Sequence, residues 1–87
     1  MLAPIRVSPV NSVTLDSISY TENSSTELAG RARLANTVRI YLNNKFEIEV
    51  KVNESGAWKA SLSNIQAGVY TLRLDELNEN GAVEGRL

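Results

Sequence analysis

Two neighbouring carboxylates, Asp75 and Glu76, come closest to a catalytic pair in this 87-residue chain. Adjacent residues of a β-strand point to opposite faces, so these two carboxylates cannot flank one bond. The chain contains no histidine and no cysteine, so the usual triads, thiol nucleophiles and zinc sites cannot be assembled. An active site of Asp, Glu, Lys or Ser alone would need a deep cleft, for which a domain this small lacks room. We therefore expect no catalytic residue, no cofactor and no enzymatic activity.

The acidic segment 75–81 contains part of a calcium-binding pattern. Glu76, Asn78 and Asn80, followed by a glycine, resemble the first half of a calcium loop. The first ligand of such a loop is normally Asp, and the twelfth position here is Leu87, which cannot supply the bidentate carboxylate. We therefore favour a hairpin loop solvated by its own charges over a metal site.

A predicted β-hairpin supplies the candidates for binding. Apolar and polar residues alternate over residues 37–42 and 46–52, on both sides of an Asn-Asn turn, so each strand has one dry face and one wet face. Tyr41, Arg39 and Glu49 fall on the wet face. We predict these three residues as candidate surface contacts.

The register of this hairpin follows from parity. A two-residue loop would place Ile40 opposite Glu47, so we favour a three-residue loop over 43–45, or a bulge. Arg39 then faces Glu49 on the outside. With the three-residue loop, the inward pairs are Leu42 with Phe46, Ile40 with Ile48 and Val38 with Val50.

Trp58 offers a large apolar face on which a sugar ring could stack. It alternates with apolar residues, however, so we expect it to be buried against the small residues Gly30 and Ala32. The other residues that alternation places in the core are Ile40, Leu42, Tyr70, Leu72 and Leu74.

The whole chain is predicted to contain about seven short strands separated by regularly spaced turn signals. Besides the hairpin, these strands are residues 12–20, 26–33, 58–62, 69–74 and 82–87. A change of phase at Asp16-Ser17 indicates a bulge or bend in the first strand. The pattern predicts an all-β chain folded as a two-sheet antiparallel sandwich.

Charge and composition restrict the partners. Nine Lys and Arg are interspersed with ten Asp and Glu, giving a net charge of -1, so a nucleic-acid partner is disfavoured. Residues 1–11 contain two prolines and no long apolar run, which predicts an extended linker with no signal peptide and no membrane insertion. We expect residues 12–87 to be a module excised from a longer protein. Charges at Lys45, Lys51 and Arg39 disfavour self-pairing of strand edges and favour a monomer.

Four segments of the chain carry the pattern of a known family. They are a small-residue strand at Leu28–Ala32, a central strand at Thr37–Leu42, a Gly-x-Trp strand at Gly56–Leu62 and a Gly-x-Tyr-x-Leu strand at Gly68–Asp75. In order and spacing they resemble the bacterial immunoglobulin-like modules that occur in tandem in surface adhesins and beside peptidoglycan-binding LysM domains. The resemblance covers about residues 13–87. The chain departs from it at residues 34–36, where many members have a Pro-Gly turn.

The resemblance implies an immunoglobulin-like β-sandwich with no enzymatic activity of its own. It implies an extracytoplasmic spacer or protein-interaction module of a bacterial envelope or surface protein, in contact with the neighbouring domains of its parent chain. The alternative is a module that binds cell-wall glycan, such as peptidoglycan, or another envelope protein. An exposed aromatic pair on one face would favour this alternative.

Overall fold

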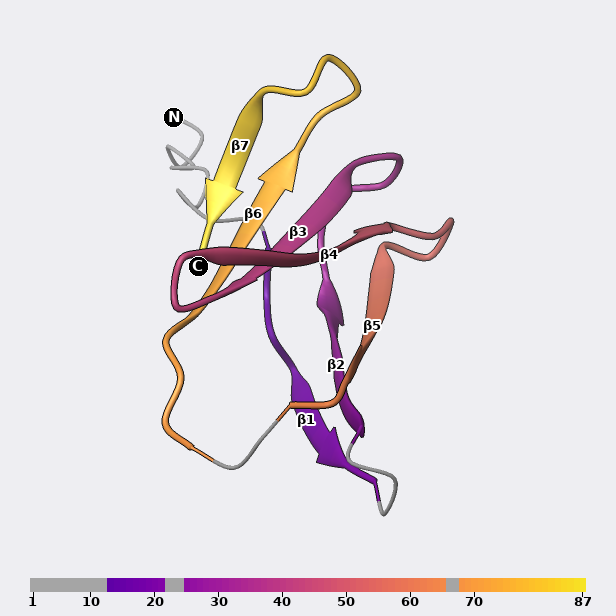
Figure 1. Ribbon diagram of the computed structural model, residues 1–87. Coiled ribbons are helices and arrows are strands. Elements are labelled where there is room, and N and C mark those ends of the chain that lie inside the picture. The colour runs from indigo at the N-terminus through magenta and orange to yellow at the C-terminus, as the bar shows by residue number, and fades with distance from the viewer. Residues whose placement is uncertain (1–12, 22–24, 66–67) are drawn as a thin grey trace, which may run out of the picture.

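The computed structural model describes residues 13–21, 25–65 and 68–87, in which seven β-strands form two antiparallel sheets (Figure 1). The first sheet has the order β1-β2-β5 and contains β1 (Ser17–Tyr20), β2 (Ser25–Arg31) and β5 (Ala57–Ser63). The second has the order β4-β3-β6-β7 and contains β3 (Thr37–Leu42), β4 (Lys45–Lys51), β6 (Leu72–Leu77) and β7 (Val83–Arg86). The predicted linker, residues 1–11, lies outside the described residues.

The two sheets pack face to face around a common core, which confirms the predicted all-β sandwich. The arrangement is consistent with an immunoglobulin-like sandwich. Because β4 pairs with β3 instead of joining the first sheet, the strands divide into three and four. None of the described residues belongs to a helix long and apolar enough to cross a membrane.

The first strand is shorter than predicted, since β1 begins only at Ser17. The segment before it still runs alongside β2. The backbone N–H groups of Thr14 and Asp16 donate to the carbonyl oxygens of Arg31 and Ala29, each at 2.8 Å. The predicted change of phase therefore coincides with the start of regular pairing.

The β3–β4 hairpin has the predicted register over most of its length. Val38 pairs with Val50, Arg39 with Glu49 and Ile40 with Ile48, as predicted. The turn, however, has two residues, Asn43 and Asn44, whose φ angles of 52° and 66° fit a type I′ turn. The register shifts after Ile40, so Tyr41 faces Phe46 and Leu42 faces Lys45. A bulge at Glu47 takes up the extra residue, which confirms the bulge predicted as the alternative to a three-residue loop. The pair of Leu42 with Phe46, which required that loop, is wrong.

Two other turns share one sequence and one set of hydrogen bonds. The sequence Asn-Glu-x-Gly-Ala occurs at residues 53–57 and 78–82. In each, the Asn side-chain oxygen accepts from the N–H groups two and four residues later, at 2.9 and 3.0 Å. The glycines, Gly56 and Gly81, have φ angles of 81° and 82°, a conformation that side chains disfavour. These residues fix both turns locally.

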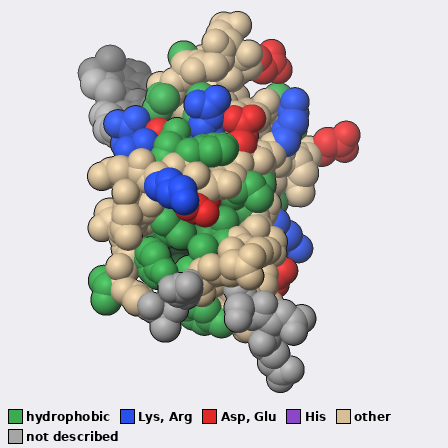
Figure 2. Space-filling view, in the orientation of Figure 1, with side chains coloured by type: hydrophobic (Ala, Val, Ile, Leu, Met, Phe, Trp, Pro, Cys, Tyr) green, Lys and Arg blue, Asp and Glu red, His purple; other side chains and the backbone are tan. Residues whose placement is uncertain are grey.

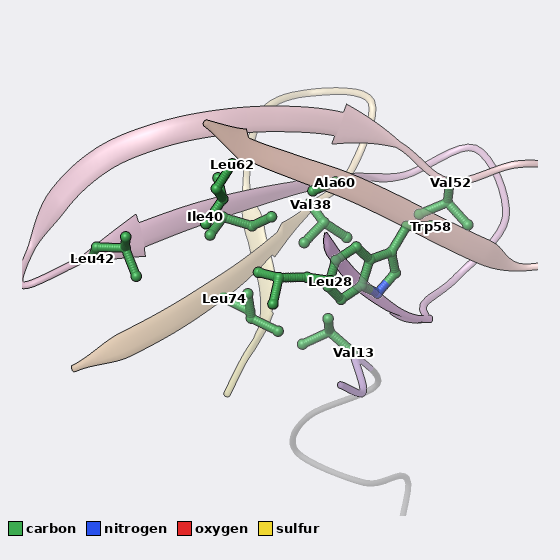
Figure 3. Packing of buried hydrophobic residues seen from close by; sticks show 10 residues of the cluster. All are labelled: Val13, Leu28, Val38, Ile40, Leu42, Val52, Trp58, Ala60, Leu62 and Leu74. Atoms are coloured by element: carbon green, nitrogen blue, oxygen red, sulfur yellow. The ribbon is translucent and has the colours of Figure 1, made fainter. Parts of the chain in front are cut away.

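The core between the sheets centres on Trp58, whose side chain is only 1% exposed (Figure 3). A Cβ atom added to Gly30, its register partner, would lie 2.9 Å from Trp58 Cζ2 and would overlap the carbonyl oxygen of Thr14. Trp58 Nε1 donates to that same oxygen at 3.2 Å. The small residue at position 30 therefore makes room for the indole, as predicted.

The predicted core residues fall into three groups. Trp58, Ile40, Leu42 and Leu74 are buried. Leu72 is partly buried and packs against the cluster. The prediction that Tyr70 belongs to the core is wrong, because this side chain is 39% exposed. Its segment precedes β6, so the strand alternation used to place it inward does not apply there.

Candidate interaction surface

The register of the second sheet brings seven side chains together on the side away from the core. Arg39 and Tyr41 alternate with buried Ile40 and Leu42, so they point outward from β3. The cross-strand partners extend these positions into two rows. The first row is Glu49, Arg39, Asp75 and Arg86, and the second is Phe46, Tyr41 and Arg73. We call these seven residues the outer face.

Ion pairs hold the charged row in place. Arg86 donates to both oxygens of Asp75, with Nε at 2.8 Å and Nη2 at 3.2 Å. Arg73 Nε lies 3.4 Å from the same carboxylate, whose side chain is only 5% exposed. Arg39 Nε donates to Glu49 at 2.7 Å. These hydrogen bonds raise the pKa of Arg39 and of Arg86 above the ordinary value, which by itself keeps an arginine charged at physiological pH.

The aromatic row lies beside the charged row. The rings of Tyr41 and Phe46 meet edge to face, with centroids 5.8 Å apart and an interplanar angle of 69°. The guanidinium carbon of Arg73 lies 4.1 Å from the centre of the Tyr41 ring, a cation–π contact. Phe46 is 50% exposed. The outer face thus combines fixed arginines with an accessible aromatic pair.

The structure brings together all three predicted contact residues. Tyr41, Arg39 and Glu49 lie on the outer face, and Arg39 forms the predicted pair with Glu49. Their role as contacts remains a prediction. The residues that sequence reasoning missed are Phe46, Arg73, Asp75 and Arg86. The outward parity of Arg73 is readable from the sequence, but the pairing of β6 with β3 is not.

The structure separates the two neighbouring carboxylates, as parity predicts. Asp75 belongs to the outer face, whereas Glu76 is fully buried and accepts from the backbone N–H of Arg33 at 3.0 Å and from Asn36 Nδ2 at 2.6 Å. Asn36 Nδ2 also donates to Glu84 at 2.9 Å. Asp75 and Glu76 therefore serve different networks on opposite sides of β6.

The solvated loop predicted over residues 75–81 is shorter in the structure. Residues 75–77 are buried in β6, so the prediction of a solvated loop over 75–81 is wrong for its first three residues. Two residues of the calcium pattern have other partners: Glu76 binds Arg33 and Asn36, and the Asn78 side-chain oxygen closes its own turn. In the described ranges, no three His, Cys, Asp or Glu side chains are placed to hold a metal ion together.

The bonds of Glu84 predict how pH affects stability. Hydrogen bonds from Asn36 and then Asn78 lower the pKa of Glu84 below its ordinary value. A carboxyl group whose pKa is lower in the folded state than in the unfolded state stabilises the fold at pH values above its unfolded-state pKa. This stabilisation is lost as the pH falls through its folded-state pKa. We expect Glu84→Gln to be less stable than the wild type at pH 7. Urea unfolding at several pH values should show this difference shrinking below about pH 4.

Glu79→Gln is the matched control for this prediction, because it removes a carboxylate from the adjacent turn without changing a partner of Asn36. A difference between wild type and Glu84→Gln that stays constant from pH 7 to about pH 3 would contradict the prediction.

Comparison with known proteins adds no relative: no family model matches the chain, and neither a curated protein sequence nor a solved structure matches it.

Proposed function

We propose that this chain is a non-catalytic protein-interaction module that binds its partner through the outer face. The observation that carries the proposal is a row of arginines paired with carboxylates beside a Tyr-Phe pair, with Arg73 stacked over Tyr41. Arginine and tyrosine are enriched among the residues that dominate binding energy at protein interfaces. Side chains that are already held in place lose little conformational freedom when a partner binds.

The non-catalytic part of the proposal is supported by the residue inventory and by geometry. The chain lacks His and Cys, and its adjacent carboxylates, Asp75 and Glu76, lie on opposite sides of β6. The sequence pattern described above supports placing the module outside the cytoplasm, in a bacterial envelope or surface protein. There it would also act as a spacer between neighbouring domains of the parent chain.

One observation favours the alternative of a glycan-binding module. Tyr41 and Phe46 form an aromatic pair on one face, and Phe46 is half exposed. Aromatic rings offer a rigid apolar surface on which the apolar face of a sugar can stack. Peptidoglycan is the glycan implied by the sequence pattern.

Photo-crosslinking tests the protein-interaction proposal. A photoreactive phenylalanine analogue placed at Phe46 should crosslink a discrete protein in a bacterial envelope extract, whereas the same analogue at Val69, which is highly exposed, should not. Arg73→Ala should raise the dissociation constant for the captured protein about 30-fold, equivalent to about 2 kcal/mol. The reason is that it removes the cation above Tyr41.

Arg31→Ala is the matched control, since Arg31 pairs with Asp16 at 3.2 Å outside the outer face. Equal effects of Arg73→Ala and Arg31→Ala on capture would contradict a role for the outer face. A titration of the isotope-labelled chain with soluble peptidoglycan fragments decides the alternative. Amide shifts confined to Tyr41, Phe46 and their neighbours would favour glycan binding over protein binding.

A further inference from the structure

The edge strand β1 lacks the protection that charged residues give to other strands. It lies at the edge of the first sheet, and Ser17, Ile18, Ser19 and Tyr20 are all exposed. Among the strands in the described residues, it alone carries no charged side chain. An open strand edge presents unpaired backbone groups to another strand, and charges are the usual means of preventing that pairing.

The predicted obstacles to self-pairing lie elsewhere in the structure. Lys45, Lys51 and Arg39 belong to β3 and β4 in the second sheet. If β4 paired with a second β4 around Ile48, Glu47 would face Glu49 and Lys45 would face Lys51, so like charges would oppose each other. Residues 17–21 contain no charged side chain, and the charge that precedes them, Asp16, is paired with Arg31.

An apolar groove of about 580 Å³ adjoins this edge. Ile18 and Tyr20 of β1 line it together with Leu42, Tyr70 and Leu72. Tyr20 is 81% exposed, and Ile18 is 45% exposed. Figure 2 shows hydrophobic side chains gathered near the middle of the view, beside and above the place where Figure 1 draws β1. Ile18 and Tyr20 thus place exposed apolar side chains directly beside the open edge of β1.

We propose that two copies of the chain pair through β1, antiparallel, about a two-fold axis at Ser19. Ser19 then faces Ser19, and each Ile18 faces a Tyr20 of the second copy on the groove side. Ser17 faces Thr21 on the opposite side. The pairing joins two three-stranded sheets into one of six strands, with apolar pairs on one face and hydroxyl pairs on the other.

The residues of this edge favour a second copy of β1 as the partner strand. A second β1 is uncharged, extended and apolar at alternate positions, which matches both the open backbone and the groove. The interface is short and therefore weak, at the small end of protein contacts. Copies held close together on one surface would meet at a high effective concentration, at which a weak contact becomes populated.

Sedimentation equilibrium of the 87-residue chain, from about 10 µM to about 1 mM, tests the proposal. We expect a reversible monomer–dimer equilibrium. Ser19→Lys should lower the association constant at least about tenfold, because two like charges would face each other at the axis. Ser61→Lys places the same charge in the same cross-strand row, two strands from β1, and should have little effect. A monomer throughout this range, or a dimer insensitive to Ser19→Lys, would overturn the proposal.

Cysteine crosslinking tests the register independently of charge. The chain has no native cysteine, and directly opposed residues of an antiparallel pair are close enough for a disulfide. Under mild oxidation, Ser19→Cys should form a covalent dimer much faster than Ser61→Cys. Equal rates would overturn pairing through β1, and faster crosslinking of Ser17→Cys would overturn the proposed axis.

Discussion

Replacing Trp58 with alanine is expected to destabilise the fold by about 3–5 kcal/mol. The indole is buried between the sheets above Gly30, so its removal leaves a cavity that the surrounding strands cannot fully close. The change also removes the hydrogen bond from Nε1 to the carbonyl oxygen of Thr14. Since small domains are stable by only about 5–15 kcal/mol, this is a large share of the total. Urea unfolding followed by far-ultraviolet circular dichroism measures the loss.

Trp58→Phe separates the two contributions. It keeps most of the apolar ring and removes the donor to Thr14, so we expect it to destabilise the fold by about 1–2 kcal/mol. This variant also provides a measurable value if Trp58→Ala is unfolded without urea. A loss below about 1 kcal/mol for Trp58→Ala would contradict the position of Trp58 in the core.

Local alternation predicted the elements whose neighbours are close in sequence. Ile40 and Trp58 are buried because each stands in an alternating strand, and the hairpin pairs of Val38 and Arg39 follow from parity. The same rule failed at Tyr70, because the chain there is not yet a strand. At Leu42 parity left two possibilities, a three-residue loop or a bulge. The pairing derived from the loop is wrong there, because the structure has the bulge.

The outer face could be predicted only in part, because its rows cross strands that are distant in sequence. Arg39 and Glu49 belong to one hairpin, and a local rule is enough to pair them. The contact of Arg73 with Tyr41 depends on which strand lies beside β3, and that is a property of the whole sheet. Asp75 was predicted in a loop because acidic residues next to a turn are usually solvated. Two arginines that face it from β6 and β7 allow it to be buried.

Asp75 of β6 pairs with Arg86 of β7 and with Arg73 of its own strand. It therefore holds two arginines of the outer face in position. We expect Asp75→Ala to destabilise the protein by about 2–3 kcal/mol, because it removes the charge-assisted hydrogen bonds of Arg86 and the ion pair with Arg73. The loss should stay below the 3–5 kcal/mol of a fully buried pair, since the Arg86 side chain is 57% exposed and water screens its charge. Urea unfolding at pH 7 measures the difference.

Asp16→Ala is the matched control, because Asp16 forms a single ion pair with Arg31 at the surface, where such a pair contributes at most about 1 kcal/mol. Asp75→Ala should also shift the NMR signals of the Tyr41 and Phe46 rings, since Arg73 loses the carboxylate that holds it over Tyr41. Equal destabilisation by the two substitutions would contradict the burial of Asp75. Unchanged ring signals would show that Arg73 keeps its position without Asp75, and the preorganisation of the outer face would then need another source.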